Sequence, residues 1–225
     1  MQADVEILIL RDKVESALDV CRPFLHADGG DVEIVAIRDG GVVAIPTDTL
    51  YGLAADPFNS SAVKRVFEAK RRPDAQPLLL VAESVAQVAR QIGSLTADAT
   101  RLAERFWPGP LTLLLAAPPT LAPGVTAGSD RIGVRVPAHE VPRALCRATA
   151  RLLTATSANV SGAPPPSDPD VVERAMGGSI DVLLDAGATP GGSPSTLVDV
   201  TEGEPHLVRA GAVPWEEVRA CLRRA

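Results

Sequence analysis

The residues with the clearest chemical use are cations that lie close together in the sequence. Lys70, Arg71 and Arg72 stand directly before Pro73. The ammonium of Lys70 and the planar guanidinium of Arg72 could hold the phosphates of a nucleotide. Cations also stabilise the last turn of a helix, by about 0.3–1 kcal/mol. Charge alone therefore does not decide between a phosphate clamp and the end of a helix.

A second pair of cations lies on an apolar stretch. Arg131 and Arg135 are four residues apart in RIGVRVP. Side chains at even spacing share one face of a strand, so we expect both guanidinium groups on the same side. Charges on a buried strand need anionic partners. Two structural salt bridges would satisfy them, and so would the carboxylate and phosphate of a ligand.

Small oxygen-bearing side chains follow two other apolar stretches. Residues 46–53 read PTDTLYGL and residues 156–162 read TSANVSG, in which Ser157 and Asn159 could point together. Such groups at strand ends suit a ligand site at the edge of an α/β sheet. A turn with capping hydroxyls uses the same residues, and chemistry alone favours the turn for the first segment. Ser195 and Arg209 are weaker candidates of the same kind.

The common phosphate-binding loops are absent from the sequence. No GxGxxG follows an apolar stretch, and none of the three lysines follows a glycine, which excludes a Walker A motif. A nucleotide enzyme built from this chain would have to hold phosphates with side chains.

Apolar strands and periodic helices alternate from residue 40 onward, which is the pattern of a layered α/β domain. We expect helices at about residues 60–70, 96–106, 141–152 and 214–222. We expect strands at residues 31–37, 42–45, 78–82, 111–116, 132–136, 152–156, 180–184 and 196–200. Two long loops rich in Pro, Gly and Ser, residues 161–169 and 187–195, are expected to be binding loops or lids.

Composition limits the class of protein. The chain has 225 residues, with 22 Lys and Arg against 28 Asp and Glu, which argues against a broad nucleic-acid surface. No apolar run approaches the roughly 18 residues of a membrane span, and the first residues lack a basic leader. The three cysteines are scattered without a CxxC, so we expect no disulfide framework, no metal site and a cytoplasmic location.

Taken in order and spacing, these segments resemble the YrdC/Sua5/TsaC family, the threonylcarbamoyl-adenylate synthases. The resemblance covers roughly residues 40–222. It rests on GGVVAIPTDTLYGLAAD, the K-x-R-P stretch, FWPGPLTLLL, RIGVRVP, TSANVSG, PSTLVD and LVRAGAV. It implies an α/β fold with a twisted, open mixed sheet and flanking helices.

The resemblance also implies a nucleotidyltransferase reaction. L-threonine, bicarbonate and ATP would give threonylcarbamoyl-AMP and pyrophosphate, for the modification of adenosine 37 in tRNA by a downstream transferase complex. A carbamate formed on the threonine amine would attack the α-phosphate. Cationic side chains and the Mg²⁺ carried by ATP would offset the repulsion between two anions. The family allows a weak contact with tRNA and needs no membrane.

Residue roles follow from the matching motifs. Arg135 matches the arginine that binds the threonine carboxylate, a task for a bidentate donor. Lys70 and Arg72 match a basic pair at the ATP and are the expected catalytic residues. The other residues expected at the threonine are Thr49, Ser157 and Ser195. The other residues expected at the nucleotide are Gln76, Arg131, Asn159, Ser167 and Arg209. Gln76 stands where the family often has Asn, and Val81 where some members have His.

The first residues carry a second, shorter resemblance. Residues 17–33 look like the start of a NifU-like iron–sulfur scaffold, but the CxxC ligands of that family are missing. We therefore divide the chain into a remnant or extension, residues 1–39, and a synthase domain, residues 40–225. Two alternatives remain for the function: a carbamoyl-transfer module on the same fold, as in hydrogenase maturation proteins, and a non-catalytic RNA-binding module.

Overall fold

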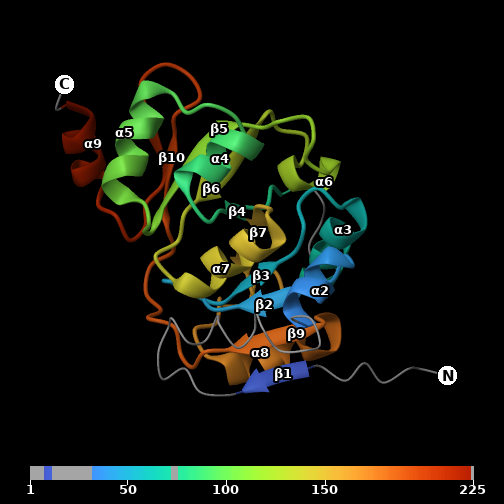
Figure 1. The fold of residues 1–225 in the computed structure, drawn as a ribbon. Helices are drawn as coiled ribbons and strands as arrows, with labels where there is room; N and C mark the ends of the chain where they lie inside the picture. The colour runs from blue at the N-terminus through green and yellow to red at the C-terminus, as the bar shows by residue number, and fades with distance from the viewer. Residues whose placement is uncertain (1–7, 12–31, 72–75, 224–225) are drawn as a thin grey trace.

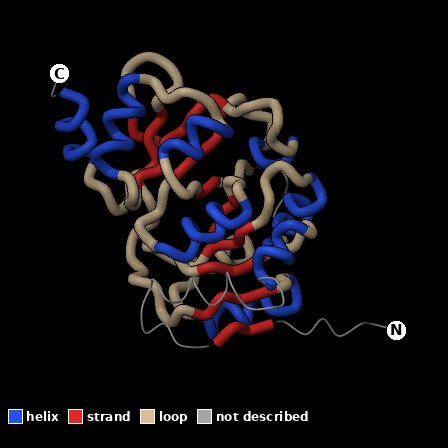
Figure 2. Tube along the Cα trace, in the orientation of Figure 1, coloured by secondary structure: helices blue, strands red, loops and turns tan. Residues whose placement is uncertain are grey.

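The described strands form two open mixed sheets in this computed structural model, which describes residues 8–11, 32–71 and 76–223. One sheet has the order β1-β9-β2-β3-β8, and the other has the order β11-β10-β5-β6-β4-β7. Figure 1 shows the first sheet below the second, and Figure 2 shows helices around both. The strands of the five-stranded sheet are β1 (Leu8–Arg11), β2 (Val43–Ile45), β3 (Gly52–Ala54), β8 (Thr156–Ser157) and β9 (Val182–Asp185). The strands of the six-stranded sheet are β4 (Leu80–Val81), β5 (Leu111–Ala116), β6 (Arg131–Arg135), β7 (Leu153–Thr154), β10 (Thr196–Asp199) and β11 (His206–Arg209).

Helices flank both sheets. They are α2 (Val32–Arg38), α3 (Ser60–Lys70), α4 (Val85–Gln91), α5 (Ala97–Phe106), α6 (Pro123–Thr126), α7 (Glu140–Thr149), α8 (Pro169–Met176) and α9 (Trp215–Arg223), with a short 3-10 turn at Gly177–Ser179. Helix α9 packs on α5 beside the six-stranded sheet, and α8 packs on β9 at the opposite end of the molecule (Figure 1). None of the helices in the described part of the chain is long and apolar enough to cross a membrane.

The two sheets share one hydrophobic core. The larger cluster of buried side chains includes Leu53 of the five-stranded sheet, Leu113 of the six-stranded sheet and Leu102 of α5. A smaller cluster lies under α7 and includes Leu145 and Leu153. Burial of apolar surface on this scale, at about 25 cal/mol per Å², holds the sheets in a fixed relation. A site built from both sheets is therefore preorganised.

Helix α3 shows how local sequence places a functional side chain. The side chain of Asn59 caps its start by accepting hydrogen bonds from the backbone of Ser61 and Ala62, at 3.0 and 3.3 Å. The helix ends at Arg71, whose φ of 49° is left-handed. Lys70 therefore lies in the last turn, and its side chain is buried among backbone oxygens described below.

Most expected elements are confirmed, with shifted ends. The helix expected at residues 60–70 has those bounds, and the helix expected at 96–106 begins at Ala97 after a Thr96 cap. The expected strand at 152–156 is two short strands, β7 and β8, that belong to different sheets. The expected fold class is confirmed as an α/β fold with open mixed sheets and flanking helices, although the strands divide between two sheets.

The strand predicted at residues 31–37 is wrong, because this segment forms helix α2. Ile34 and Ile37 are three residues apart, which suits a helix face as well as an irregular strand. In so short a segment the spacing of apolar residues does not decide between a helix and a strand. Tertiary packing decides instead: Ile37 is buried in the smaller cluster with Leu145, and Val35 remains 45% exposed.

The division of the chain at residue 39 remains a prediction, because most of residues 1–31 lie outside the described residues. Two described elements fall in this part. Strand β1 pairs in parallel with β9, from Leu8 opposite Val182 to Arg11 opposite Asp185. Helix α2 packs against α7. Both elements join the layers of the larger domain.

Candidate functional site

A cavity of about 610 Å³ lies between the two sheets. Strands β3 and β8 line it from one sheet, and strands β4, β5, β6, β10 and β11 line it from the other. Its polar lining consists of hydroxyls, one amide and two guanidinium groups, from Thr47, Thr49, Gln76, Thr112, Arg135, Thr156, Ser157, Ser195 and Arg209. Leu79, Leu80, Val81, Leu197 and three prolines add apolar surface. A few polar groups on an apolar wall are typical of a small-molecule site.

The segment after β2 is both a turn and a wall of the cavity. The Thr47 hydroxyl accepts hydrogen bonds from the backbone N–H groups of Thr49 and Leu50, at 3.1 and 3.2 Å, and donates to the Leu50 carbonyl at 2.7 Å. The two threonine hydroxyls are 3.1 Å apart. The turn interpretation and the site interpretation of this segment therefore hold together, because the turn presents both hydroxyls to the cavity.

The two long loops are bound to this same segment. The backbone N–H of Tyr51 donates to the Pro166 carbonyl at 3.0 Å, and Gly191 donates to the Thr49 carbonyl at 2.8 Å. The Tyr51 hydroxyl donates to the Gly187 carbonyl at 2.7 Å. Burial raises the pKa of Tyr51 to about 12. Both loops are thus tied to this segment, and Pro165 and Pro194 from them join the cavity lining.

Arg135 lies at the cavity end of β6 and is held by an aspartate. Its Nη2 donates to Asp48 Oδ1 at 2.8 Å, and the two side chains are 8% and 13% exposed. Burial lowers the pKa of Arg135, the Asp48 carboxylate raises it, and the charge of Arg209 lowers it further. The two arginines are therefore close enough to act on each other, and one carboxylate accompanies them.

A second group of polar side chains in the cavity lining comes from three different segments: Thr112, Ser195 and Arg209. Thr112 Oγ1 and Ser195 Oγ are 2.7 Å apart. Arg209 Nη2 donates to the Ser195 carbonyl at 2.9 Å and to its hydroxyl at 3.3 Å. Burial lowers the pKa of Arg209. Gly211 is needed here, because a Cβ at this position would lie 2.3 Å from the Pro194 carbonyl.

Lys70 supports Ser157 and Asn159 from behind the cavity wall. Its ammonium donates to the Ser157 carbonyl, to the Asn159 carbonyl at 2.9 Å and to Asn159 Oδ1 at 3.3 Å. The Ser157 hydroxyl donates to the same amide oxygen. The Asn159 amide nitrogen donates to the Ala163 carbonyl at 2.6 Å. Ser157 lines the cavity, and the other two side chains fix its position.

The structure brings most of the expected residues together. Those that line the cavity are Thr49, Gln76, Arg135, Ser157, Ser195 and Arg209, and Lys70 and Asn159 contact Ser157. Ser167 does not line the cavity; its carbonyl accepts from the backbone of Thr189 at 2.8 Å and so joins the two loops. Arg72 lies outside the described residues.

Arg131 is not at the cavity. Its guanidinium is bound to Asp199, and it lies 3.5 Å from Asp130 and 3.4 Å from Glu202. It is four positions from Arg135 along the strand, which amounts to about 13 Å at roughly 3.3 Å per residue. Even spacing constrains the face of the strand on which the two arginines lie, and it does not bring them to one ligand. The expected nucleotide contact of Arg131 therefore has no support in this arrangement.

Two residues at the site, one in the cavity lining and one behind it, are missing from the expected set. Thr112 is a polar residue inside the apolar run LTLLLA, and this interruption was the available signal. Asp48 lies inside a predicted site segment, but its partner was not deducible from spacing. Each contacts a residue far away in the chain, Ser195 and Arg135 respectively. Only tertiary structure reveals such pairs.

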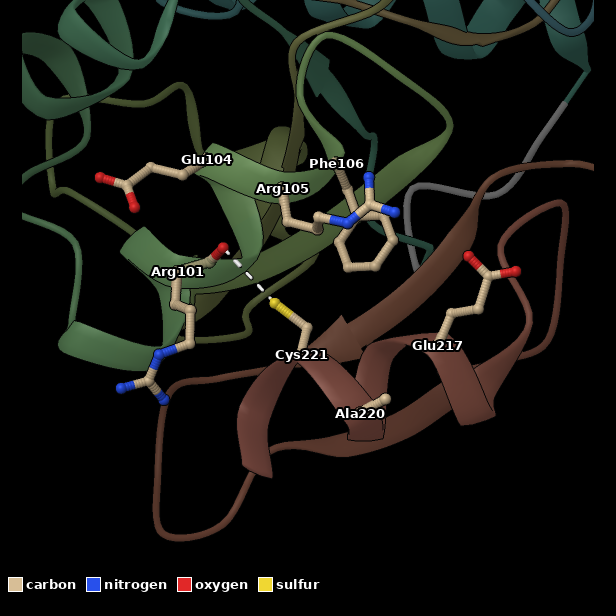
Figure 3. A pocket seen from close by; sticks show the side chains of 7 residues that line it. All are labelled: Arg101, Glu104, Arg105, Phe106, Glu217, Ala220 and Cys221. Atoms are coloured by element: carbon tan, nitrogen blue, oxygen red, sulfur yellow. Dashed lines mark hydrogen bonds between the residues drawn. The ribbon is translucent and has the colours of Figure 1, made fainter. Parts of the chain in front are cut away.

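A second hollow, of about 520 Å³, lies between α5 and α9 (Figure 3). Its charged side chains include Arg101, Glu104, Arg105 and Glu217, of both signs. Arg101 forms an ion pair with Asp98 at 3.1 Å. The Cys221 thiol points toward the Arg101 carbonyl, at 3.7 Å. This hollow shows no convergence of like charges and hydroxyls of the kind found between the sheets.

The chain matches known proteins over most of its length. The Sua5/YciO/YrdC family model, described as Telomere recombination, matches residues 35–211. A threonylcarbamoyl-AMP synthase of Pyrococcus abyssi is 42% identical over 186 residues, which cover 83% of this chain and 55% of the relative. The enzyme of that name from Bacillus subtilis is 38% identical over 187 residues, covering 83% and 54%. The chain thus spans little more than half the length of these relatives.

A solved structure has the same arrangement of elements. The crystal structure of P. abyssi Sua5 complexed with L-threonine aligns with a TM-score of 0.84 at 36% identity, over 96% of this chain and 61% of that chain. The fold and the relative positions of the sheets are therefore shared with a protein that binds an amino acid.

Proposed function

Because the chain belongs to the Sua5/YciO/YrdC family, we propose that it is a threonylcarbamoyl-AMP synthase. It joins L-threonine, bicarbonate and MgATP and releases pyrophosphate. The observation that carries this proposal is the cavity between the sheets, where Arg135 and Arg209 lie among hydroxyl groups. Two negatively charged reactants have to meet in this reaction, and a water-poor site with an excess of positive charge favours their approach.

We assign the threonine carboxylate to Arg135. A planar guanidinium donates two parallel hydrogen bonds to a carboxylate, and this one lines the cavity. The hydroxyls of Thr49 and Ser195 lie on the same lining and suit the amine and hydroxyl of the amino acid. The L-threonine held by the P. abyssi relative supports this assignment.

We assign the nucleotide to the part of the cavity bounded by Ser157, Gln76 and Arg209. The ammonium of Lys70 is bound to oxygens of residues 157–159, so its clearest contribution is to fix Ser157. Contact of Lys70 and Arg72 with the triphosphate remains a prediction. Mg²⁺ enters with ATP and neutralises part of the charge on the phosphates.

The chemistry then needs placement more than proton transfer. Bicarbonate, on dehydration, supplies CO2, and the threonine amine adds to it and loses a proton to give a carbamate. A carbamate oxygen attacks the α-phosphorus of ATP, and the bond to the β-phosphate breaks as pyrophosphate leaves. Transfer of this type depends mainly on positioning and charge stabilisation. We propose a tRNA-modifying transferase as the consumer of the product, and the cytoplasm as the compartment.

The test is threonine-dependent conversion of ATP to AMP-containing product and pyrophosphate by the purified chain. We expect pyrophosphate release that requires both L-threonine and bicarbonate. RNA binding without ATP turnover would favour an RNA-binding module. Turnover that requires carbamoyl phosphate and ignores threonine would favour a carbamoyl-transfer module. Either outcome overturns the proposal.

A further inference from the structure

We propose that Asp48 is a positioning residue, which directs the Arg135 guanidinium into the cavity. Its carboxylate also neutralises one of the two positive charges, those of Arg135 and Arg209, at this end of the cavity. The inference deepens the proposed function and rests on it. It concerns a residue that contacts the carboxylate-binding group and does not itself line the cavity.

The ion pair joins the two walls of the cavity. Asp48 lies in the turn between β2 and β3 of the five-stranded sheet, and Arg135 ends β6 of the six-stranded sheet. The bond from Arg135 Nη2 to Asp48 Oδ1 is 2.8 Å long and buried from solvent. A long, flexible arginine side chain that is anchored at one nitrogen has few remaining rotamers. The anchor therefore fixes where the other N–H groups point.

Only part of the guanidinium is used by this bond. An arginine carries five N–H donors, and the described residues provide an acceptor for Nη2 alone. Arg135 lines the cavity, so its remaining donors are available to a ligand. A second protein carboxylate at this position would occupy those donors, and none is bonded to them among the described residues.

Asp48 shows a sign of a functional constraint. Its Oδ2 is buried and has no hydrogen-bond partner among the described residues. Such an atom costs stability, so a purely structural role would be served better by a fully bonded group. The charge of the carboxylate, rather than its full set of hydrogen bonds, is what this position provides.

The charges at this end of the cavity explain why a carboxylate is needed beside Arg135. Arg135 and Arg209 act on each other, and Asp48 is the carboxylate that acts on Arg135. The charge of Asp48 also acts on His139, which caps α7 through Nδ1 and whose pKa is lowered by burial. Two cations and one anion leave one positive charge. That surplus remains available to the anionic groups of the reactants.

The experiment compares Asp48→Asn, Asp48→Glu and Asp130→Asn with the wild type, by steady-state kinetics and by calorimetric binding of L-threonine. Asn keeps the shape of Asp and removes the charge, and Glu restores the charge. Asp130 is 84% exposed beside Arg131, the other arginine of β6, and serves as the matched control.

For Asp48→Asn we expect the KM and Kd for threonine to rise about 10- to 100-fold, the range expected from one hydrogen bond to a charged group. The KM for ATP should stay within about twofold, because the lost interaction concerns only the amino acid. Asp48→Glu should recover part of the loss, and Asp130→Asn should match the wild type.

The outcomes separate the two proposals. An Asp48→Asn variant that binds threonine as the wild type does, or whose KM values for threonine and ATP rise equally, overturns the role of Asp48 alone. If the Asn variant does not fold, Asp48→Glu is compared with an added Asp48→Ala variant. A Glu variant that binds threonine more tightly than the Ala variant supports positioning, and a Glu variant as weak as the Ala variant overturns it. A wild type that neither binds nor uses threonine overturns the proposed function as well.

Discussion

The two arginines of β6 share a strand and have opposite surroundings. Arg135 is buried, contacts one carboxylate and lies near a second guanidinium. Arg131 is 32% exposed at its side chain and has three carboxylates around it. Burial lowers the pKa of Arg135, whereas the hydrogen bond and charge of Asp199 raise the pKa of Arg131.

This difference shows what makes an arginine available to an anion. Around Arg131 the acidic groups outnumber the cation, so its charge is already consumed in linking β6 to β10. Around Arg135 the cations outnumber the acidic groups, so the local charge remains positive. An excess of positive charge in a low-dielectric cavity attracts an anionic ligand much more strongly than the same charge in water. Position along the strand, rather than residue type, decides the role.

The largest expected effect comes from removing the buried arginine. Arg135→Ala should lower kcat/KM for threonine by at least about 100-fold, because each hydrogen bond to a charged group contributes about 1.5–3 kcal/mol. Pyrophosphate release at varied threonine measures it. Arg131→Ala is the matched variant, and its kcat/KM should stay within about twofold of the wild type. An equal loss of kcat/KM in the two variants would contradict the different roles given to Arg135 and Arg131.

A large effect on stability is expected at Lys70. Lys70→Met should lower the free energy of unfolding by about 2 kcal/mol or more, because the Asn159 carbonyl loses its ammonium donor and the Ser157 carbonyl keeps, among the described residues, only the backbone N–H of Asn159. Activity should fall with it, as Ser157 loses its support. Denaturant unfolding measures the change. Lys64→Met, in the same helix but with a side chain 77% exposed, is the control and should differ little from the wild type.

A smaller, pH-dependent effect is expected at Tyr51. The unfolded chain releases the Tyr51 proton from about pH 10, and the folded chain keeps it until about pH 12. The folded state therefore binds more protons in this window, and its stability falls as the pH rises from about 10 to 12. The stability of Tyr51→Phe, measured by unfolding in the same window, should fall less steeply. Parallel curves for the two proteins would contradict the raised pKa.

The smallest effect is expected at Asp199, the buried partner of Arg131. Burial alone would raise the pKa of Asp199, but hydrogen bonds from Thr201 and the charge of Arg131 hold it below its ordinary value. Its stabilising contribution is present above the ordinary aspartate pKa and is lost as the pH falls through the lower folded value. Arg131→Gln should weaken the acid dependence of stability without altering threonine use. A large change in threonine affinity would place Arg131 in the site after all.

The sequence predicts individual helices, strands and site segments better than it predicts which distant side chains contact each other. The spacing of apolar residues locates α3 and β6, and the motif TSANVSG locates Ser157 and Asn159. The contacts of Asp48 with Arg135 and of Thr112 with Ser195 join residues 87 and 83 positions apart. Such partners depend on how the sheets pack, and no local pattern encodes them.

The errors have physical causes of the same kind. Residues 32–38 form a helix, with Ile37 buried in the cluster under α7, and a run of seven residues does not fix the period of the apolar side chains. The even spacing of Arg131 and Arg135 predicts one shared face of the strand, but the rise per residue places the two side chains at different ends of that strand. In both cases the local rule is correct, but the secondary structure and the contacts of these residues depend on tertiary packing, which the rule does not include.

The most direct measurement of the central claim is a structure of this chain with L-threonine and a non-hydrolysable ATP analogue. We predict that the threonine carboxylate lies within about 3 Å of the Arg135 guanidinium, in hydrogen-bond contact, while Asp48 keeps its bond to that arginine and Arg131 stays bound to Asp199. Threonine bound elsewhere, or bound at Arg131 with Arg135 still directed only at Asp48, would contradict the account.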